Sequence, residues 1–159
     1  MASSKAIPVD ANGRAIFDSD WGLTAEKVMT FAGATANDPG DHDGTGDPAT
    51  LFTVKGSVLL RILAICTTTL VGASATVEVG TTASTAGLIA QTTATDIDAN
   101  EIWHDASPDS SLELSSVLAE NIVSADVIQT VATANITAGV IKYVALWYPL
   151  TQGSEVVAA

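Results

Sequence analysis

The feature that most constrains the fold is a succession of short β-forming runs between residues 51 and 148, separated by clusters of Gly, Asp, Asn and Ser. Residues 75–80 show the clearest pattern, because Val77 and Val79 alternate with polar residues, as expected of a strand with one buried face. The other candidate strands cover residues 51–54, 57–66, 88–93, 101–105, 112–114, 127–133 and 140–148. Helical periodicity is missing between them. We therefore expect an all-β fold, an antiparallel two-sheet sandwich of about eight strands that is jelly-roll-like.

The first 20 residues differ from the rest, since they mix Ser, Pro, Asn, Gly and Asp with isolated apolar residues. We interpret residues 1–20 as an extended N-terminal arm that lies on a partner surface, with Ile16, Phe17 and Trp21 as candidate partner contacts. A frayed terminus is the alternative. The length of 159 residues fits one further domain, so residues 21–159 are expected to form the β-sandwich.

Two segments are ambiguous between strand and helix. In residues 21–32, Thr24 is a possible helix N-cap, but a period of two favours a strand that ends at Gly33. Residues 115–122 are the one serious helix candidate in the second half of the chain, with room for one or two turns.

A Gly/Asp-rich loop is predicted at residues 34–48, and we expect its central part, residues 38–47, to be solvent-exposed. Asp41, Asp43 and Asp47 match the opening of a calcium loop of the EF-hand type. The twelfth position, which supplies a bidentate Glu in such loops, is Phe52, and no helices are expected to flank the loop. We therefore expect no metal here, with a calcium loop of another kind as the alternative.

The chain offers little for catalysis. Cys66 lies in an apolar run and is predicted to be a buried hydrophobe. His104 precedes Asp105 on an expected strand, where adjacent side chains point to opposite faces, so we interpret it as a half-buried strand histidine. No nucleophile motif or metal-binding cluster accompanies it. Trp103 and Trp147 are expected to be largely buried. We predict no catalytic residue, no cofactor and no enzyme activity.

The charge of the chain excludes several partners. Eighteen Asp and Glu oppose six scattered Lys and Arg, giving a net charge of −12. Binding to nucleic acid takes cations that neutralise phosphates, and an anionic membrane surface repels such a chain. The N-terminus has no apolar core of signal-peptide length. We expect neither a nucleic-acid nor a membrane partner, and synthesis in the cytosol.

Several stretches resemble structural proteins of tailed bacteriophages: residues 52–62, 65–69, 75–80, 87–92, 98–105 and 143–150. Within that group the chain looks most like capsid decoration, or cement, proteins. The resemblance implies a compact β domain that stands on the capsid surface of the virion as a homo-oligomer, most often a trimer. It implies the major capsid protein as partner, an arm that reaches neighbours, and synthesis in the bacterial host cytoplasm.

Other functions stay open at this point. Tail and head-fibre proteins share the same strand-rich composition, although the chain has no repetitive shaft. A carbohydrate-binding or receptor-binding β-sandwich would need exposed aromatic side chains or a calcium site. A hydrolase would need two carboxylates brought together in space.

Overall fold

The structure is a computed structural model of the 159-residue chain, and it describes residues 23–110 and 119–159. The described chain is all-β apart from one short 3-10 turn, η1 (Ala94–Asp96). Its strands are β1 (Leu23–Thr30), β2 (Ala49–Lys55), β3 (Val58–Val71), β4 (Thr76–Thr81), β5 (Ser84–Thr93), β6 (Glu101–Trp103), β7 (Asp109–Ser110), β8 (Asn121–Val123), β9 (Val127–Ala132), β10 (Ala138–Pro149) and β11 (Glu155–Ala158).

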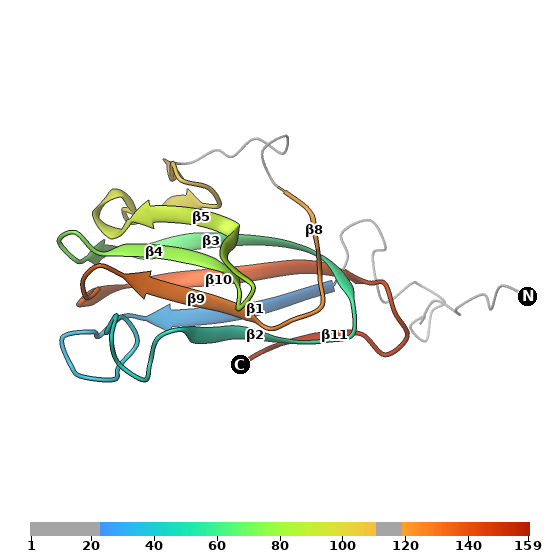
Figure 1. Ribbon diagram of the computed structural model, residues 1–159. Helices are drawn as coiled ribbons and strands as arrows, with labels where there is room; N and C mark the ends of the chain where they lie inside the picture. Colours follow the sequence, from blue (N-terminus) through green and yellow to red (C-terminus); the bar gives the residue numbers. More distant parts are fainter. Residues whose placement is uncertain (1–22, 111–118) are drawn as a thin grey trace, which may run out of the picture.

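Two antiparallel sheets pack against each other (Figure 1). The six-stranded sheet has the order β1-β10-β3-β6-β7, with β8 also paired to β3, and the five-stranded sheet has the order β11-β2-β9-β4-β5. The chain crosses repeatedly between the layers, as from β1 to β2, β2 to β3 and β9 to β10. This interleaved order is that of a jelly roll. The predicted two-sheet sandwich is confirmed.

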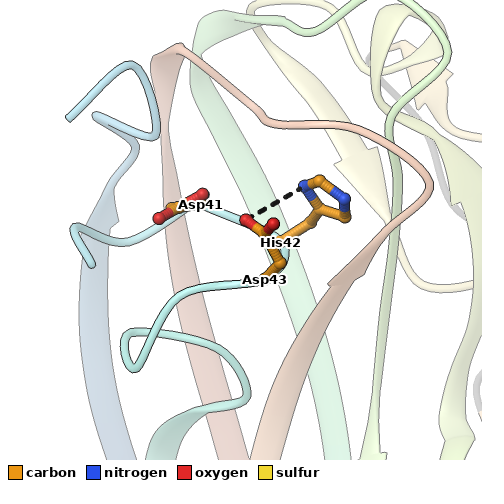
Figure 2. A group of neighbouring side chains, drawn as sticks. All are labelled: Asp41, His42 and Asp43. Carbon is orange, nitrogen blue, oxygen red and sulfur yellow. Dashed lines mark ion pairs between the residues drawn. The ribbon is translucent and has the colours of Figure 1, made fainter. Parts of the chain in front are cut away.

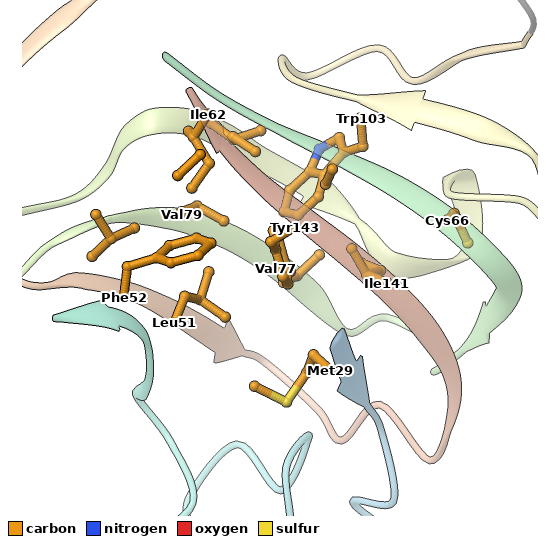
Figure 3. Packing of buried hydrophobic residues seen from close by; sticks show 14 of the residues in the cluster. Met29, Leu51, Phe52, Ile62, Cys66, Val77, Val79, Trp103, Ile141 and Tyr143 are labelled. Carbon is orange, nitrogen blue, oxygen red and sulfur yellow. The ribbon is translucent and has the colours of Figure 1, made fainter. Parts of the chain in front are cut away.

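The long strands β3 and β10 form the spine of the six-stranded sheet. Their register sets Ala64 opposite Tyr143 and Leu60 opposite Trp147. Every second residue of both strands is buried between the sheets, where it meets Leu51, Phe52 and other side chains of the five-stranded sheet (Figure 3). One hydrophobic core therefore joins the two layers.

Three buried side chains cross-link the centre of the sandwich. The hydroxyl of Tyr143, on β10, donates a hydrogen bond of 2.7 Å to Gln129 Oε1, on β9 in the other sheet. The ring of Trp103 meets Tyr143 edge to face, with 6.4 Å between centroids, a favoured aromatic geometry. Trp103 is 0% exposed and Trp147 7%, so their predicted burial is confirmed.

The ambiguous segments resolve in part. The strand predicted at residues 21–32 is confirmed as β1. The arm and its candidate contacts Ile16, Phe17 and Trp21 lie outside the described residues. The helix predicted at residues 115–122 is wrong at its end, because Asn121 to Val123 pair with β3 as a strand.

The strand predicted at residues 112–114 also lies outside the described part of the chain. The structure describes eleven strands where about eight were expected. The three that the sequence pattern did not indicate are β7, β8 and β11, each of which has at most four residues.

Candidate functional site

The outer face of the six-stranded sheet is apolar. The residues that alternate with the buried positions of β3 and β10 are partly exposed and therefore point away from the core. The strand register adds their neighbours on the same face. This outer face comprises Leu59, Arg61, Leu63 and Ile65 on β3, Lys142, Val144, Leu146 and Tyr148 on β10, Ile102 on β6, Asp109 on β7, Ile122 on β8, and Thr24, Glu26 and Val28 on β1.

The apolar side chains of the outer face form a continuous band. Leu63 lies opposite Val144 at its centre, and Leu59 lies opposite both Tyr148 and Ile122. Residues that face each other on adjacent strands are in contact distance. Ile122 is 72% exposed. Large exposed apolar patches of this kind mark surfaces that bind another macromolecule.

Both cations of the outer face are paired with carboxylates. Arg61 is 2.9 Å from Glu120, and Lys142 is 2.9 Å from Glu26. Both cations lie on the two central strands, and each carboxylate comes from a flanking segment. With Glu120, and with Asp109 of β7 opposite Ile102, the outer face thus holds two positive and three negative groups, in a chain whose net charge is −12.

The outer side of the five-stranded sheet is polar by contrast. Glu78 and Gln91 hydrogen-bond there at 3.1 Å, and Thr53 on β2 is exposed. An antiparallel sheet with one solvated face alternates apolar and polar residues, whereas a strand that is covered on both faces is apolar throughout. β3 from Val58 to Cys66 and β10 from Val140 to Tyr148 come close to the second pattern, with Arg61 and Lys142 as the exceptions.

The Gly/Asp-rich loop is folded onto the body of the protein. Gly40 and Asp41 are buried, so the prediction that residues 38–47 are solvent-exposed is wrong at its centre. Gly40 has a φ of +100°, and a Cβ there would lie 2.3 Å from the carbonyl oxygen of Ile136. Composition indicates a turn but not its burial, and here glycine permits the close approach of two backbones.

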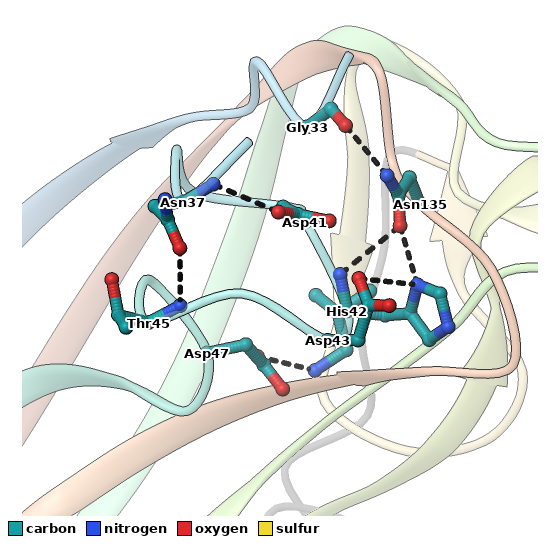
Figure 4. A network of polar contacts seen from close by, with 9 residues as sticks. Gly33, Asn37, Asp41, His42, Asp43, Thr45, Asp47 and Asn135 are labelled. Carbon is teal, nitrogen blue, oxygen red and sulfur yellow. Dashed lines mark hydrogen bonds and ion pairs between the residues drawn. The ribbon is translucent and has the colours of Figure 1, made fainter. Parts of the chain in front are cut away.

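Asn135 ties this loop to the turn before β10 (Figure 4). Its Oδ1 accepts a hydrogen bond of 3.1 Å from the His42 backbone amide, and its Nδ2 donates one of 2.7 Å to the carbonyl of Gly33. The His42 ring Nδ1 contacts the same Oδ1. Asn135 was not singled out by its sequence pattern, which indicated only a turn.

Asp41, His42 and Asp43 form the one group of possible metal ligands among the described residues (Figure 2). Their ligand atoms lie within 4.8 Å of one another, and His42 Nδ1 is 3.8 Å from Asp43 Oδ1. Asp41 Oδ2 already accepts the Asn37 amide at 2.8 Å, and this bond holds the pKa of Asp41 below its usual value. Two carboxylates and one imidazole fall short of the six to eight oxygens that calcium takes.

Asp47, the third candidate calcium ligand, has a different position. Its Oδ1 accepts a hydrogen bond of 2.7 Å from the Val131 amide on β9, and burial raises the pKa of Asp47 to about 6. The structure therefore brings Asp41 and Asp43 together and engages Asp47 with the sheet.

His104 and Cys66 are both buried, which argues against a reactive role for either side chain. His104 is 7% exposed, so it is buried and not half-buried as predicted. Its Nε2 lies 3.4 Å from Asp105 Oδ2: the strand ends at Trp103, so the expected alternation does not apply. Burial raises the pKa of the Cys66 thiol, whose Sγ donates to the carbonyl of Thr68 at 3.2 Å. A thiol with a raised pKa is a poor nucleophile.

An open groove of about 380 Å³ runs between the β4–β5 hairpin and β8. Its lining residues are Thr81, Ser84, Gly87, Leu88 and residues 121–125. None of them has a titratable side chain, so the groove offers no group for acid–base chemistry.

Comparison with known proteins gives no relative: no family model matches the chain, and neither a curated protein nor a solved structure is similar to it. Among the described residues, no helix is long and apolar enough to cross a membrane. The outer face is thus the candidate functional site, and its signal in the sequence is the nearly unbroken apolar runs at residues 58–66 and 140–148.

Proposed function

We propose that this protein is a structural subunit that is built into a larger protein assembly, and specifically a capsid decoration protein of a tailed bacteriophage. The observation that carries the proposal is the largely apolar outer face of the six-stranded sheet, whose cations are paired. Leu63 and Val144 at its centre are aliphatic and partly exposed. A stable protein keeps such a surface covered, and assembly is the way to cover it.

The described residues favour this function over sugar binding. Sugar-binding modules present aromatic rings at the surface, but the described Phe and Trp residues and Tyr143 are buried. Tyr148 alone among the described aromatic residues is partly exposed. The open groove, with its untitratable lining, offers no support for a hydrolase.

The resemblance to decoration proteins supplies the identity of the larger partner. We propose that the major capsid protein is that partner, that the particle surface is the location, and that residues 1–20 reach onto it. The net charge of −12 directs the domain to a site with complementary charge on the shell.

Co-sedimentation tests the proposal. Purified protein is mixed with empty heads of the parent virus and centrifuged, and the pellet is analysed for the bound chain. We expect saturable binding at a fixed ratio to the major capsid protein, and the chain itself in purified virions. Virions that lack the chain, together with heads that do not bind it, would refute the proposal.

A further inference from the structure

We infer that the outer face of the six-stranded sheet is covered by the outer faces of other copies of this chain. The inference rests on the proposed function, since it names the first partner of the same surface. A face-to-face pair related by a two-fold axis buries this surface, because such an axis joins the same patch of both copies. The subunit that reaches the shell is then an oligomer whose apolar faces are already hidden.

The size of the outer face is sufficient for a specific contact. Four strands about 4.8 Å apart give a width of about 19 Å, and nine residues at about 3.3 Å give a length of about 30 Å. Each copy thus offers on the order of 570 Å², and two copies bury on the order of 1,100 Å². A specific protein interface needs about 1,000 Å² in total.

Charge is the second argument for a like partner. Two copies of a chain with a net charge of −12 repel each other wherever their surfaces are acidic. The outer face contains its own counter-ions, because Arg61 pairs with Glu120 and Lys142 with Glu26. Apart from Asp109 at the β7 edge, the charges of the face are paired, so two such faces repel each other far less than the acidic remainder of the surface does.

The chemistry of the centre is the third argument. Leu63 and Val144 face each other at the centre, with Ile65 and Leu146 beside them, and the paired cations Lys142 and Arg61 lie opposite these two. Permanent homo-oligomer interfaces are more apolar than those of transient complexes and resemble a domain core cut in half. A lipid surface is a poor alternative, because anionic headgroups repel the chain and no cation of the face is left unpaired.

Sedimentation velocity of the full chain over a range of concentrations tests the inference. We expect the wild-type protein to sediment as an oligomer. Leu63→Glu and Val144→Glu, which place a carboxylate in the centre of the face, should weaken association by about a hundredfold or more and yield the 16.2 kDa monomer. Thr53→Glu, on the outer side of the five-stranded sheet, is the matched control and should leave the oligomer intact. Circular dichroism and cooperative unfolding show that each variant folds.

The outcomes separate this inference from the proposed function. A wild-type oligomer that Leu63→Glu and Val144→Glu leave intact overturns the inference. So does a wild-type monomer that binds heads and loses them on Leu63→Glu, in which case the proposed function stands. A monomer that associates only after deletion of residues 1–22 would show that this segment covers its own face. An oligomer that never binds heads retains the inference and refutes the proposed function.

Discussion

Replacing Tyr143 with Phe removes one hydroxyl from the centre of the sandwich, and we expect this to lower the free energy of unfolding by about 1–3 kcal/mol. The hydroxyl donates to Gln129 Oε1 at 2.7 Å, and both residues are 0% exposed. Gln129 Nε2 has no hydrogen-bond partner among the described residues. Without the Tyr143 hydroxyl, the whole side-chain amide of Gln129 is therefore buried without a partner. The ring stays, and with it the edge contact to Trp103. The decrease in the free energy of unfolding therefore measures the loss of the hydrogen bond and not the creation of a cavity.

A double-mutant cycle isolates the free energy of the hydrogen bond between Tyr143 and Gln129. Gln129→Leu with Tyr143→Phe replaces both polar partners by apolar groups, and we expect the double variant to recover most of the loss, since an apolar pair leaves nothing unsatisfied. Urea unfolding at neutral pH gives the four free energies. The phenol stays protonated throughout, because burial raises its pKa well above the usual value. A loss below about 0.5 kcal/mol in Tyr143→Phe, or a double variant weaker than either single one, would refute the reasoning.

Three further predictions concern the loop and the arm. The folded-state pKa of Asp47 is raised from 3.8 to about 6, so its contribution to stability is greatest below its unfolded pKa and is lost as the pH rises through about 6. Asp47→Asn still accepts the Val131 amide and cannot ionise, so it should raise the melting temperature at about pH 7.5 and change it little at about pH 4.5; an equal shift at both pH values would contradict the assignment. We expect calorimetry to detect no micromolar calcium binding, and a heat signal that Asp43→Asn abolishes would show otherwise. Deleting residues 1–20 should leave the domain folded, with an unchanged far-ultraviolet dichroism spectrum, and weaken its binding to heads; truncated protein that binds as tightly as the full chain would exclude a role for the arm.

The two-sheet sandwich was predictable because its long strands have strong local patterns. Val77 and Val79 alternate with polar residues, and Trp103 and Trp147 are large apolar side chains that pack in the core as expected. The short strands were not predictable, since a run such as residues 155–158 is too brief for a period to emerge. β11 is held by its pairing to β2 and by the burial of Val156, which are tertiary effects.

The candidate site has a signal in the sequence, although these residues were predicted only as strands and not as a site. Residues 58–66 are apolar at both odd and even positions, and this pattern indicates a strand covered on both faces. Only the strand order shows that nothing in the described chain provides the second cover for β3 and β10. The prediction for the loop failed for another reason: the loop is tied to the body of the protein by Asn135, which lies 93 residues beyond its partner His42.

The outer faces of the two sheets differ in polarity. One outer layer carries Leu63 and Val144, and the other carries the exposed Thr53 and Gln91. An isolated subunit is therefore amphipathic as a whole domain, with one apolar and one polar outer side. At an air–water boundary it adsorbs with β3 and β10 toward the air. Dilute samples thus lose protein to vessel walls and bubbles, and single subunits in a thin vitrified film present one view to the electron beam.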